Sequence, residues 1–101
     1  MKYFIITSSP APGVSDDQAT DEAIITAHLQ HIQRGFDEGW ILFSGPKAQT
    51  SGGVLIMKAE SESAVEAFFA TDPLQVAGIL KNEWVEFKLH DCQDAIKHWF
   101  A

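Results

Sequence analysis

The chain has 101 residues, of which 46% are hydrophobic, so one core is the most that it can bury. Seven lysine and arginine residues stand against fourteen aspartate and glutamate residues, and the basic residues do not cluster. The resulting net charge of -7 argues against nucleic acid as a partner. No apolar stretch approaches the roughly 18 residues of a membrane span, so we expect no membrane partner and a cytoplasmic location.

The first part of the chain predicts a strand, a helix and a second strand. Residues 2–7 are β-branched and aromatic, and a Ser- and Pro-rich loop is expected to follow as far as residue 17. Over 21–38, apolar residues recur at spacings of three and four, which predicts an amphipathic helix that ends before Gly39. The apolar run over 40–44 predicts the next strand.

The second part of the chain continues the same alternation. A strand is predicted over 54–58, after a connection rich in Gly and Ser, and a helix over 60–70. A short helical turn is expected over 74–80. Polar and apolar residues then alternate within 83–89, which predicts a strand with one solvated face, and a short terminal helix is expected over 94–100.

The element order β-α-β-β-α-β predicts an α+β fold with one antiparallel sheet and both helices on one face. We expect a single domain over 1–101, with a core of about 2–89 and a short C-terminal extension over 90–101. Three of the four strands are apolar on consecutive residues, which indicates burial of both sheet faces. Because two helices cover only one face, we expect the other to pack against an identical subunit in a homodimer.

Two histidines lie in the predicted helix over 21–38. At about 100° per residue, His28 points inward beside the apolar stripe and His31 lies toward the edge. A core histidine that binds a backbone carbonyl is one reading of His28, and an acid–base group is the other. The spacing of three also suits a metal pair, but no further ligand has the required spacing, so no metal is expected. No glycine-rich nucleotide motif is present, so no cofactor is expected.

Three further positions carry polar groups that a pocket needs. Asp72 stands before a proline, where an aspartate most often caps the following turn. Paired with His28, it would instead orient the imidazole and stabilise its protonated form. Ser44 is followed by Gly45 and Pro46, which form either a simple turn or a substrate-binding wall whose hydroxyl holds a substrate oxygen.

These residues favour a small-molecule enzyme with His28 as general base and acid and Asp72 as the group that fixes its tautomer. Ser44 or a backbone amide would bind the substrate oxygen. The expected chemistry is proton transfer next to a carbonyl or phenol, which gives isomerisation or elimination. The alternative is a non-catalytic dimeric module that binds or senses a small ligand. A purely structural dimer is a third reading.

The segments Ala27-His28-Leu29, Ser44-Gly45-Pro46 and Asp72-Pro73, in this order and spacing, resemble the YCII-related family over residues 2 to about 89. The resemblance implies a ferredoxin-like subunit that forms a dimeric α+β barrel, with the pocket between sheet and helices. It also implies a catalytic pair at His28 and Asp72, with Ser44 next to the pocket. A characterised member of the family removes chloride from a chlorinated hydroxyquinol.

The chain departs from that family at two places. Many members carry an arginine three residues before the histidine, where this chain has Ile25, and this argues against an anionic substrate. The extension over 90–101 is longer than usual and could close the pocket or mediate assembly.

Overall fold

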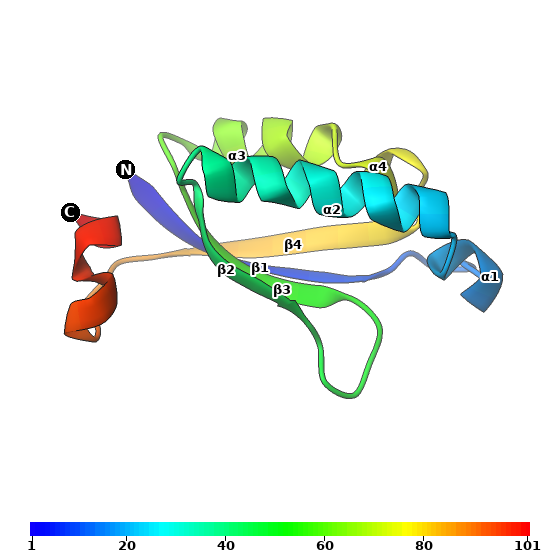
Figure 1. Cartoon of the computed structure of the whole chain (residues 1–101), viewed down its shortest axis with the longest axis horizontal. Coiled ribbons are helices and arrows are strands. Elements are labelled where there is room, and N and C mark those ends of the chain that lie inside the picture. The colour runs from blue at the N-terminus through cyan, green and yellow to red at the C-terminus, as the bar shows by residue number, and fades with distance from the viewer.

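The computed structural model describes the backbone of residues 1–101 and all side chains except those of Asp16 and Ala19. Its elements, shown in Figure 1, are β1 (Lys2–Pro10), α1 (Asp16–Ala19), α2 (Glu22–Asp37), β2 (Ile41–Pro46), β3 (Gly53–Ala59), α3 (Glu62–Ala70), α4 (Pro73–Val76), β4 (Leu80–Phe87) and the 3-10 helix η1 (Asp94–Phe100).

The four strands form one antiparallel sheet in the order β2-β3-β1-β4, so the first and third strands lie in the centre. Helices α2 and α3 lie together on one side of this sheet (Figure 1). The ferredoxin-like α+β fold expected from the element order is therefore confirmed. None of the described helices is long and apolar enough to cross a lipid bilayer.

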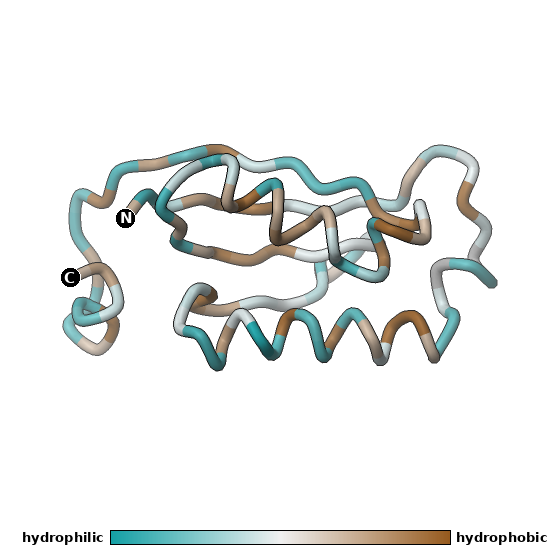
Figure 2. The backbone as a smooth tube through the Cα atoms, turned by 90° about the horizontal axis from the view of Figure 1, so that it is seen from above, coloured by the Kyte–Doolittle hydropathy of each residue, from teal (hydrophilic) through white to brown (hydrophobic). Residues whose placement is uncertain are grey.

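Helix α2 carries the two histidines and follows the predicted range closely. It starts after Asp21, whose side chain accepts a hydrogen bond of 3.1 Å from the N–H of Ile24. It ends where Gly39 adopts a φ of 80°, a left-handed conformation that favours glycine. Hydrophilic and hydrophobic residues alternate along its turns, as Figure 2 shows from above, so one stripe faces the sheet.

Two strands run further than the sequence predicts. β1 continues to Pro10, because Ser8 to Pro10 still pair with β4 in regular antiparallel register. β2 likewise continues through Gly45 and Pro46, which pair with the start of β3. A short helix, α1, also begins within the predicted loop, at its end. Pairing with a distant strand outweighs the local preference of Ser, Gly and Pro for turns.

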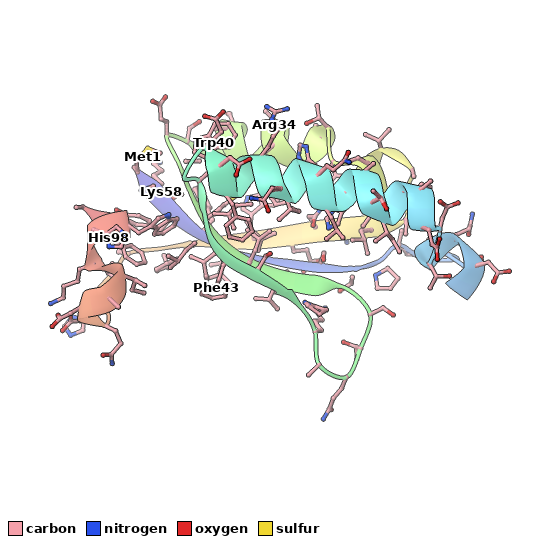
Figure 3. The ribbon with its side chains drawn as sticks, in the orientation of Figure 1. Met1, Arg34, Trp40, Phe43, Lys58 and His98 are labelled. Atoms are coloured by element: carbon pink, nitrogen blue, oxygen red, sulfur yellow. The ribbon has the colours of Figure 1, made fainter. Side chains whose placement is uncertain are left out.

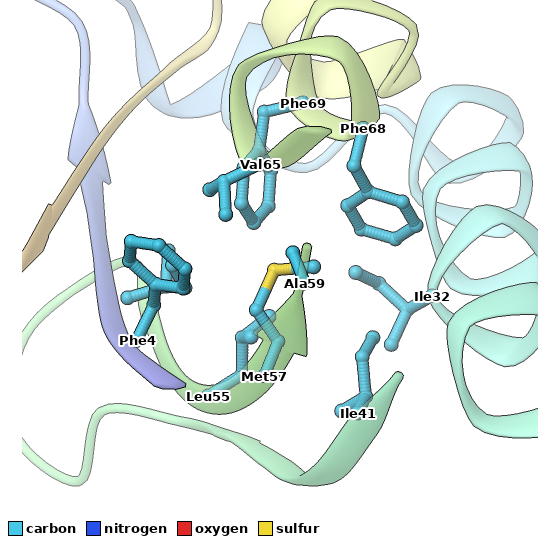
Figure 4. Packing of buried hydrophobic residues seen from close by; sticks show 10 residues of the cluster. Phe4, Ile32, Ile41, Leu55, Met57, Ala59, Val65, Phe68 and Phe69 are labelled. Carbon is cyan, nitrogen blue, oxygen red and sulfur yellow. The ribbon is translucent and has the colours of Figure 1, made fainter. Parts of the chain in front are cut away.

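The core fills the space between α2, α3 and the inner face of the sheet. Phe4 and Met57 sit opposite each other on paired strands and are both almost fully buried. Figure 4 shows how the core side chains from the sheet meet those from the two helices. The buried cluster consists of Phe4, Ile6, Ile32, Ile41, Leu55, Met57, Ala59, Val65, Phe68 and Phe69. These contacts fix α2 against the sheet, and thereby fix where its histidines point.

The outer face of the sheet carries an apolar row that crosses all four strands. Phe43, Ile56, Ile5 and Val85 are direct partners across β2, β3, β1 and β4. Phe43 is 51% exposed and Val85 is 58% exposed. Figure 3 shows Phe43 on the side of the sheet opposite to α2. Both sheet faces therefore carry apolar residues, but the outer face is open in the single chain, so burial of both faces stays a prediction.

The C-terminal extension docks on one end of this outer face. Trp99 is buried and its indole N–H donates to the carbonyl of Gly39 at 3.0 Å. The ammonium group of Lys58 donates to the carbonyl of Trp99 at 2.6 Å and lies 4.7 Å from the centre of its ring. The Tyr3 hydroxyl donates to the carbonyl of Phe100 at 2.7 Å. The extension lies at the end of the sheet away from α1 and the β2–β3 connection (Figures 1 and 3).

Replacing Trp99 by alanine should lower the free energy of unfolding by about 3–5 kcal/mol, the usual cost of truncating a buried tryptophan. The loss combines the buried ring surface, the hydrogen bond to Gly39 and the contact with Lys58. Urea denaturation measures it. Trp99→Phe is the matched control, because it keeps an aromatic ring and should lose less. Wild-type stability of the alanine variant would contradict the docked position of the extension.

Candidate active site

Helix α2 and the start of α4 bring together two side chains that are 44 residues apart in the chain. Nδ1 of His28 lies 2.8 Å from Oδ1 and 3.0 Å from Oδ2 of Asp72. Asp72 is 1% exposed, whereas the His28 side chain is 21% exposed. A buried carboxylate is thus joined to an imidazole that solvent and ligands can reach.

The proline after Asp72 favours the extended backbone conformation that Asp72 adopts. Pro73 disfavours a helical conformation for the residue before it and suits the first position of a helix. Asp72 accordingly has φ -67° and ψ 124°, caps α4, and accepts a hydrogen bond of 3.0 Å from the N–H of Leu74. The two roles considered from the sequence, helix cap and partner of His28, are therefore filled by one side chain at once.

The contact with Asp72 also fixes which nitrogen of His28 carries a proton. A carboxylate only accepts hydrogen bonds, so Nδ1–H of His28 is the donor and Nε2 keeps a free lone pair in the neutral ring. The reading of His28 as a core histidine bound to a backbone carbonyl is wrong. The bond to a backbone carbonyl is instead made by the partly buried His31, whose Nε2–H donates to the carbonyl of Phe68 at 2.7 Å.

His28 and Asp72 line a cavity of about 660 Å³, a size in the range of small-molecule sites. Its apolar walls come from Ile6, Ile25, Leu29, Ile32, Val54, Leu55, Phe69, Leu74, Ile79 and Leu80. Polar side chains reach it from Ser8, Thr20, His28, Ser44, Ser51, Asp72 and Asn82. Among the described side chains that line it there is no lysine or arginine, and none comes from the C-terminal extension.

Ser44, Gly45 and Pro46 line the cavity as the sequence suggests, but as part of β2 and not as a turn. Ser44 pairs with Leu55, whose buried side chain lies on the inner face, so the serine hydroxyl belongs to the same face. A Cβ added to Gly45 would meet no atom within 4 Å. Packing within the chain therefore does not demand glycine at this position.

Four polar residues of the cavity, Ser8, Thr20, Ser51 and Asn82, are not among those that the sequence singled out. Asn82 and Ser8 are direct partners on β4 and β1. The side-chain amide of Asn82 donates to Oε1 of Gln75 at 2.8 Å, and the Ser8 hydroxyl accepts from the N–H of Gly53 at 2.8 Å. The alternation within β4 is the signal that could have placed Asn82 inward, but the predicted strand began at residue 83, three residues after the observed start at Leu80.

The rim of the cavity depends on a glycine in the β2–β3 connection. Gly52 has a φ of 103°, and a Cβ there would lie 1.9 Å from the carbonyl oxygen of Ser8. Gly52→Ala should therefore lower the free energy of unfolding by more than the roughly 1–2 kcal/mol that a left-handed backbone costs a non-glycine residue. Thermal unfolding tests this, with Gly45→Ala as a control expected to change stability little. Equal stability of both variants would contradict this packing of the rim.

The two histidines of α2 do not share a site. His28 binds Asp72, whereas His31 binds a backbone carbonyl of α3. No group of three or more His, Cys, Asp or Glu side chains within the described part of the chain is arranged to hold a metal ion. Among the described lining residues, the cavity therefore offers one imidazole, one carboxylate, and the hydroxyl and amide groups of Ser8, Thr20, Ser44, Ser51 and Asn82.

Comparison with known proteins identifies the family and supports the fold. The model of the YCII-related domain matches residues 1–88. Among solved structures, the chain is similar to 5-chloro-2-hydroxyhydroquinone dehydrochlorinase (TftG) from Burkholderia phenoliruptrix AC1100, in its complex with 2,5-dihydroxybenzoquinone. The identity is 25%, the match covers 85% of this chain and 93% of that chain, and the TM-score is 0.68. Among curated proteins, no sequence matches significantly. The chain belongs to the YCII-related domain family.

Proposed function

We propose that this protein is a small-molecule enzyme in which His28 moves a proton on a substrate bound in the cavity. The observation that carries the proposal is the bond between the buried carboxylate of Asp72 and Nδ1–H of His28. It holds the imidazole in the tautomer whose Nε2 is a base, in a wall of the cavity. The similarity to a dehydrochlorinase supports chemistry on a small molecule.

In this mechanism, Nε2 of His28 accepts a proton from a phenolic hydroxyl or from a carbon next to a carbonyl. The carboxylate of Asp72 stabilises the imidazolium that forms. In an isomerisation, the ring returns the proton to another carbon. In an elimination, the electron pair left on the substrate forms a double bond, the leaving group departs as an anion, and the proton passes from His28 to solvent. The hydroxyl of Ser44 donates to the substrate oxygen that gains charge.

The walls of the cavity suggest the class of substrate. They are mostly apolar, and no lysine or arginine among the described residues is available there to pair with a carboxylate or phosphate. Ile25 stands in the wall where many members of the family carry an arginine. A cyclic or aromatic molecule with hydroxyl or carbonyl groups, and without a carboxylate or phosphate, fits these walls best.

The proposal can be tested with the compounds of the similar enzyme. We expect 2,5-dihydroxybenzoquinone to perturb the NMR signals of His28, and hydroxylated rings with a halide leaving group, such as 5-chloro-2-hydroxyhydroquinone, to release chloride. Leu29 and Leu74, which line the same cavity, should shift as well, whereas residues of the C-terminal extension should not. Binding without turnover of any compound in such a panel would favour the non-catalytic binding module over the enzyme.

We also propose that two copies of the chain form a dimer through the outer face of the sheet. The apolar row of Phe43, Ile56, Ile5 and Val85 supports this, because its two ends are more than half exposed and the row carries no charge. A two-fold axis would place the row against itself and cover it in both copies.

Val85→Glu should convert the dimer into a monomer, because each copy would bring a carboxylate into the covered row. Light scattering coupled to size exclusion measures the change, from twice the 11.2 kDa of one chain to a single chain. Val76→Glu is the matched control, since Val76 is a strongly exposed valine on α4 and lies outside this face. A monomeric wild type, or a Val85→Glu variant that stays dimeric, would contradict the proposed interface.

A further inference from the structure

His31 ties helix α2 to the last turn of α3. Its Nε2–H donates to the carbonyl of Phe68 at 2.7 Å, and its ring lies 4.3 Å from the ring of Phe68, centre to centre, at an angle of 33°. Phe68 belongs to the buried core. The contact is therefore anchored on a side chain that has little freedom to move.

The segment that His31 holds leads directly to Asp72. Carbonyls in the last turn of a helix lack partners within the helix and need other donors. Here the carbonyl of Phe68 also accepts from the Thr71 hydroxyl at 3.2 Å, and the carbonyl of Phe69 accepts from the N–H of Asp72 at 3.0 Å. Together these bonds set the path of the chain from the end of α3 into Asp72.

Helix α2 thus holds residues 68–72 at two points. His28 and His31 are one helical turn apart, and their partners, Asp72 and the carbonyl of Phe68, lie at opposite ends of that segment. In the described part of the chain, these are the two polar side-chain links between α2 and the segment. If the His31 link is lost, the contact between His28 and Asp72 is the one of these two polar links that remains, beside the core packing of Phe68 and Phe69.

We infer that His31 is a positioning residue that sets the geometry between His28 and Asp72. This inference rests on the proposed function, in which the tautomer of His28 matters. A displacement of about 1 Å can cost roughly 10²-fold in rate, so a link one turn away can control turnover without contacting the substrate. Nε2 of His31 carries its proton in both the neutral and the charged ring, so the link holds in either state.

The experiment compares His31→Phe with His31→Gln. Phenylalanine keeps a ring against Phe68 but removes the donor, whereas glutamine places an N–H donor close to the position of Nε2. In His31→Phe we expect the ¹⁵N signals of His28 to change from one tautomer to a mixture, the Nδ1 proton to exchange faster with water, and kcat to fall about 10²-fold with little change in KM. His31→Gln should restore the wild-type signals and most of kcat.

Thr71→Val is the matched control, because it removes the other donor to the same carbonyl without touching α2. It should leave the His28 signals unchanged. Unchanged His28 signals in a folded but less stable His31→Phe variant would overturn the inference and leave His31 with a purely structural role. If His31→Phe does not fold, His31→Leu, which also lacks the donor, takes its place: altered His28 signals support the inference and unchanged signals overturn it.

The outcome is separable from that of the proposed function. The NMR signals of His28 are read in the free protein, without any substrate. A wild-type protein that turns over no compound would contradict the proposed enzymatic function. The His31 variants would still show whether this residue sets the geometry of His28 and Asp72. Conversely, an active wild type with unchanged His28 signals in His31→Phe would defeat only the positioning role.

Discussion

Replacing His28 by alanine should lower turnover by about 10²- to 10⁴-fold, the usual contribution of a positioned acid–base group. No other imidazole lines the cavity among the described side chains, so no neighbouring histidine can take over the proton. The measurement is kcat on a compound that the wild type converts, at matched substrate saturation.

Truncation to alanine also leaves the buried carboxylate of Asp72 without its partner, so a loss of activity must be separated from a loss of fold. His28→Asn makes this separation. The asparagine amide takes the place of Nδ1 and can donate to Asp72, but it offers no basic nitrogen. It should therefore be as inactive as the alanine variant while unfolding close to the wild-type temperature. Wild-type turnover in a folded His28→Asn variant would show that His28 is not the base.

The pair of His28 and Asp72 could be found from the sequence because both residues lie where local rules are strong. Helical periodicity fixes the direction of His28 relative to the apolar stripe of α2. The proline after Asp72 fixes that residue in an extended conformation at the start of a helix. The contact between the two side chains depends on tertiary packing, which local rules do not predict. The resemblance to the YCII-related family implied it.

The features that the sequence did not predict depend on contacts between distant segments. Periodicity places His31 near the edge of the stripe, but it does not reveal that the carbonyl of Phe68 lies opposite. Likewise, Pro10 and Pro46 remain in strands because β4 and β3 pair with them, although both follow residues that favour turns. Asn82 lines the cavity from the first part of β4, which precedes the clearly alternating stretch, so the sequence pattern did not place it there.

Asp72 links the stability of the fold to the chemistry of the site. The same carboxylate caps α4 through the N–H of Leu74 and orients His28. A substitution that removes the side chain would disturb both roles, and its effect on turnover could not be assigned. The informative substitution keeps the helix cap and changes only the group that faces Nδ1 of His28.

Asp72→Asn is that change, and it should lower turnover by as much as about 10⁴-fold while the fold persists. Asparagine caps helices about as well as aspartate, so its oxygen can still accept from the N–H of Leu74. With the oxygen kept at the cap, in the place of Oδ1, the amide N–H₂ takes the place of Oδ2, 3.0 Å from Nδ1 of His28, and can only donate. Two N–H donors then oppose each other, and the carboxylate charge that held Nδ1–H is gone, so we expect the neutral imidazole to move its proton to Nε2. The nitrogen that faced the substrate as a base is then lost.

Two measurements on Asp72→Asn test this account together. The ¹⁵N signals of His28 should change from the Nδ1–H to the Nε2–H tautomer, and kcat should fall with them. Asp21→Asn is the matched control, because Asp21 also caps a helix through its side chain, at the start of α2, and has no histidine partner. It should change neither the signals nor the rate. If Asp72→Asn keeps the Nδ1–H tautomer and wild-type turnover, the carboxylate acts only as a helix cap. The proposal that Asp72 makes His28 a base is then wrong.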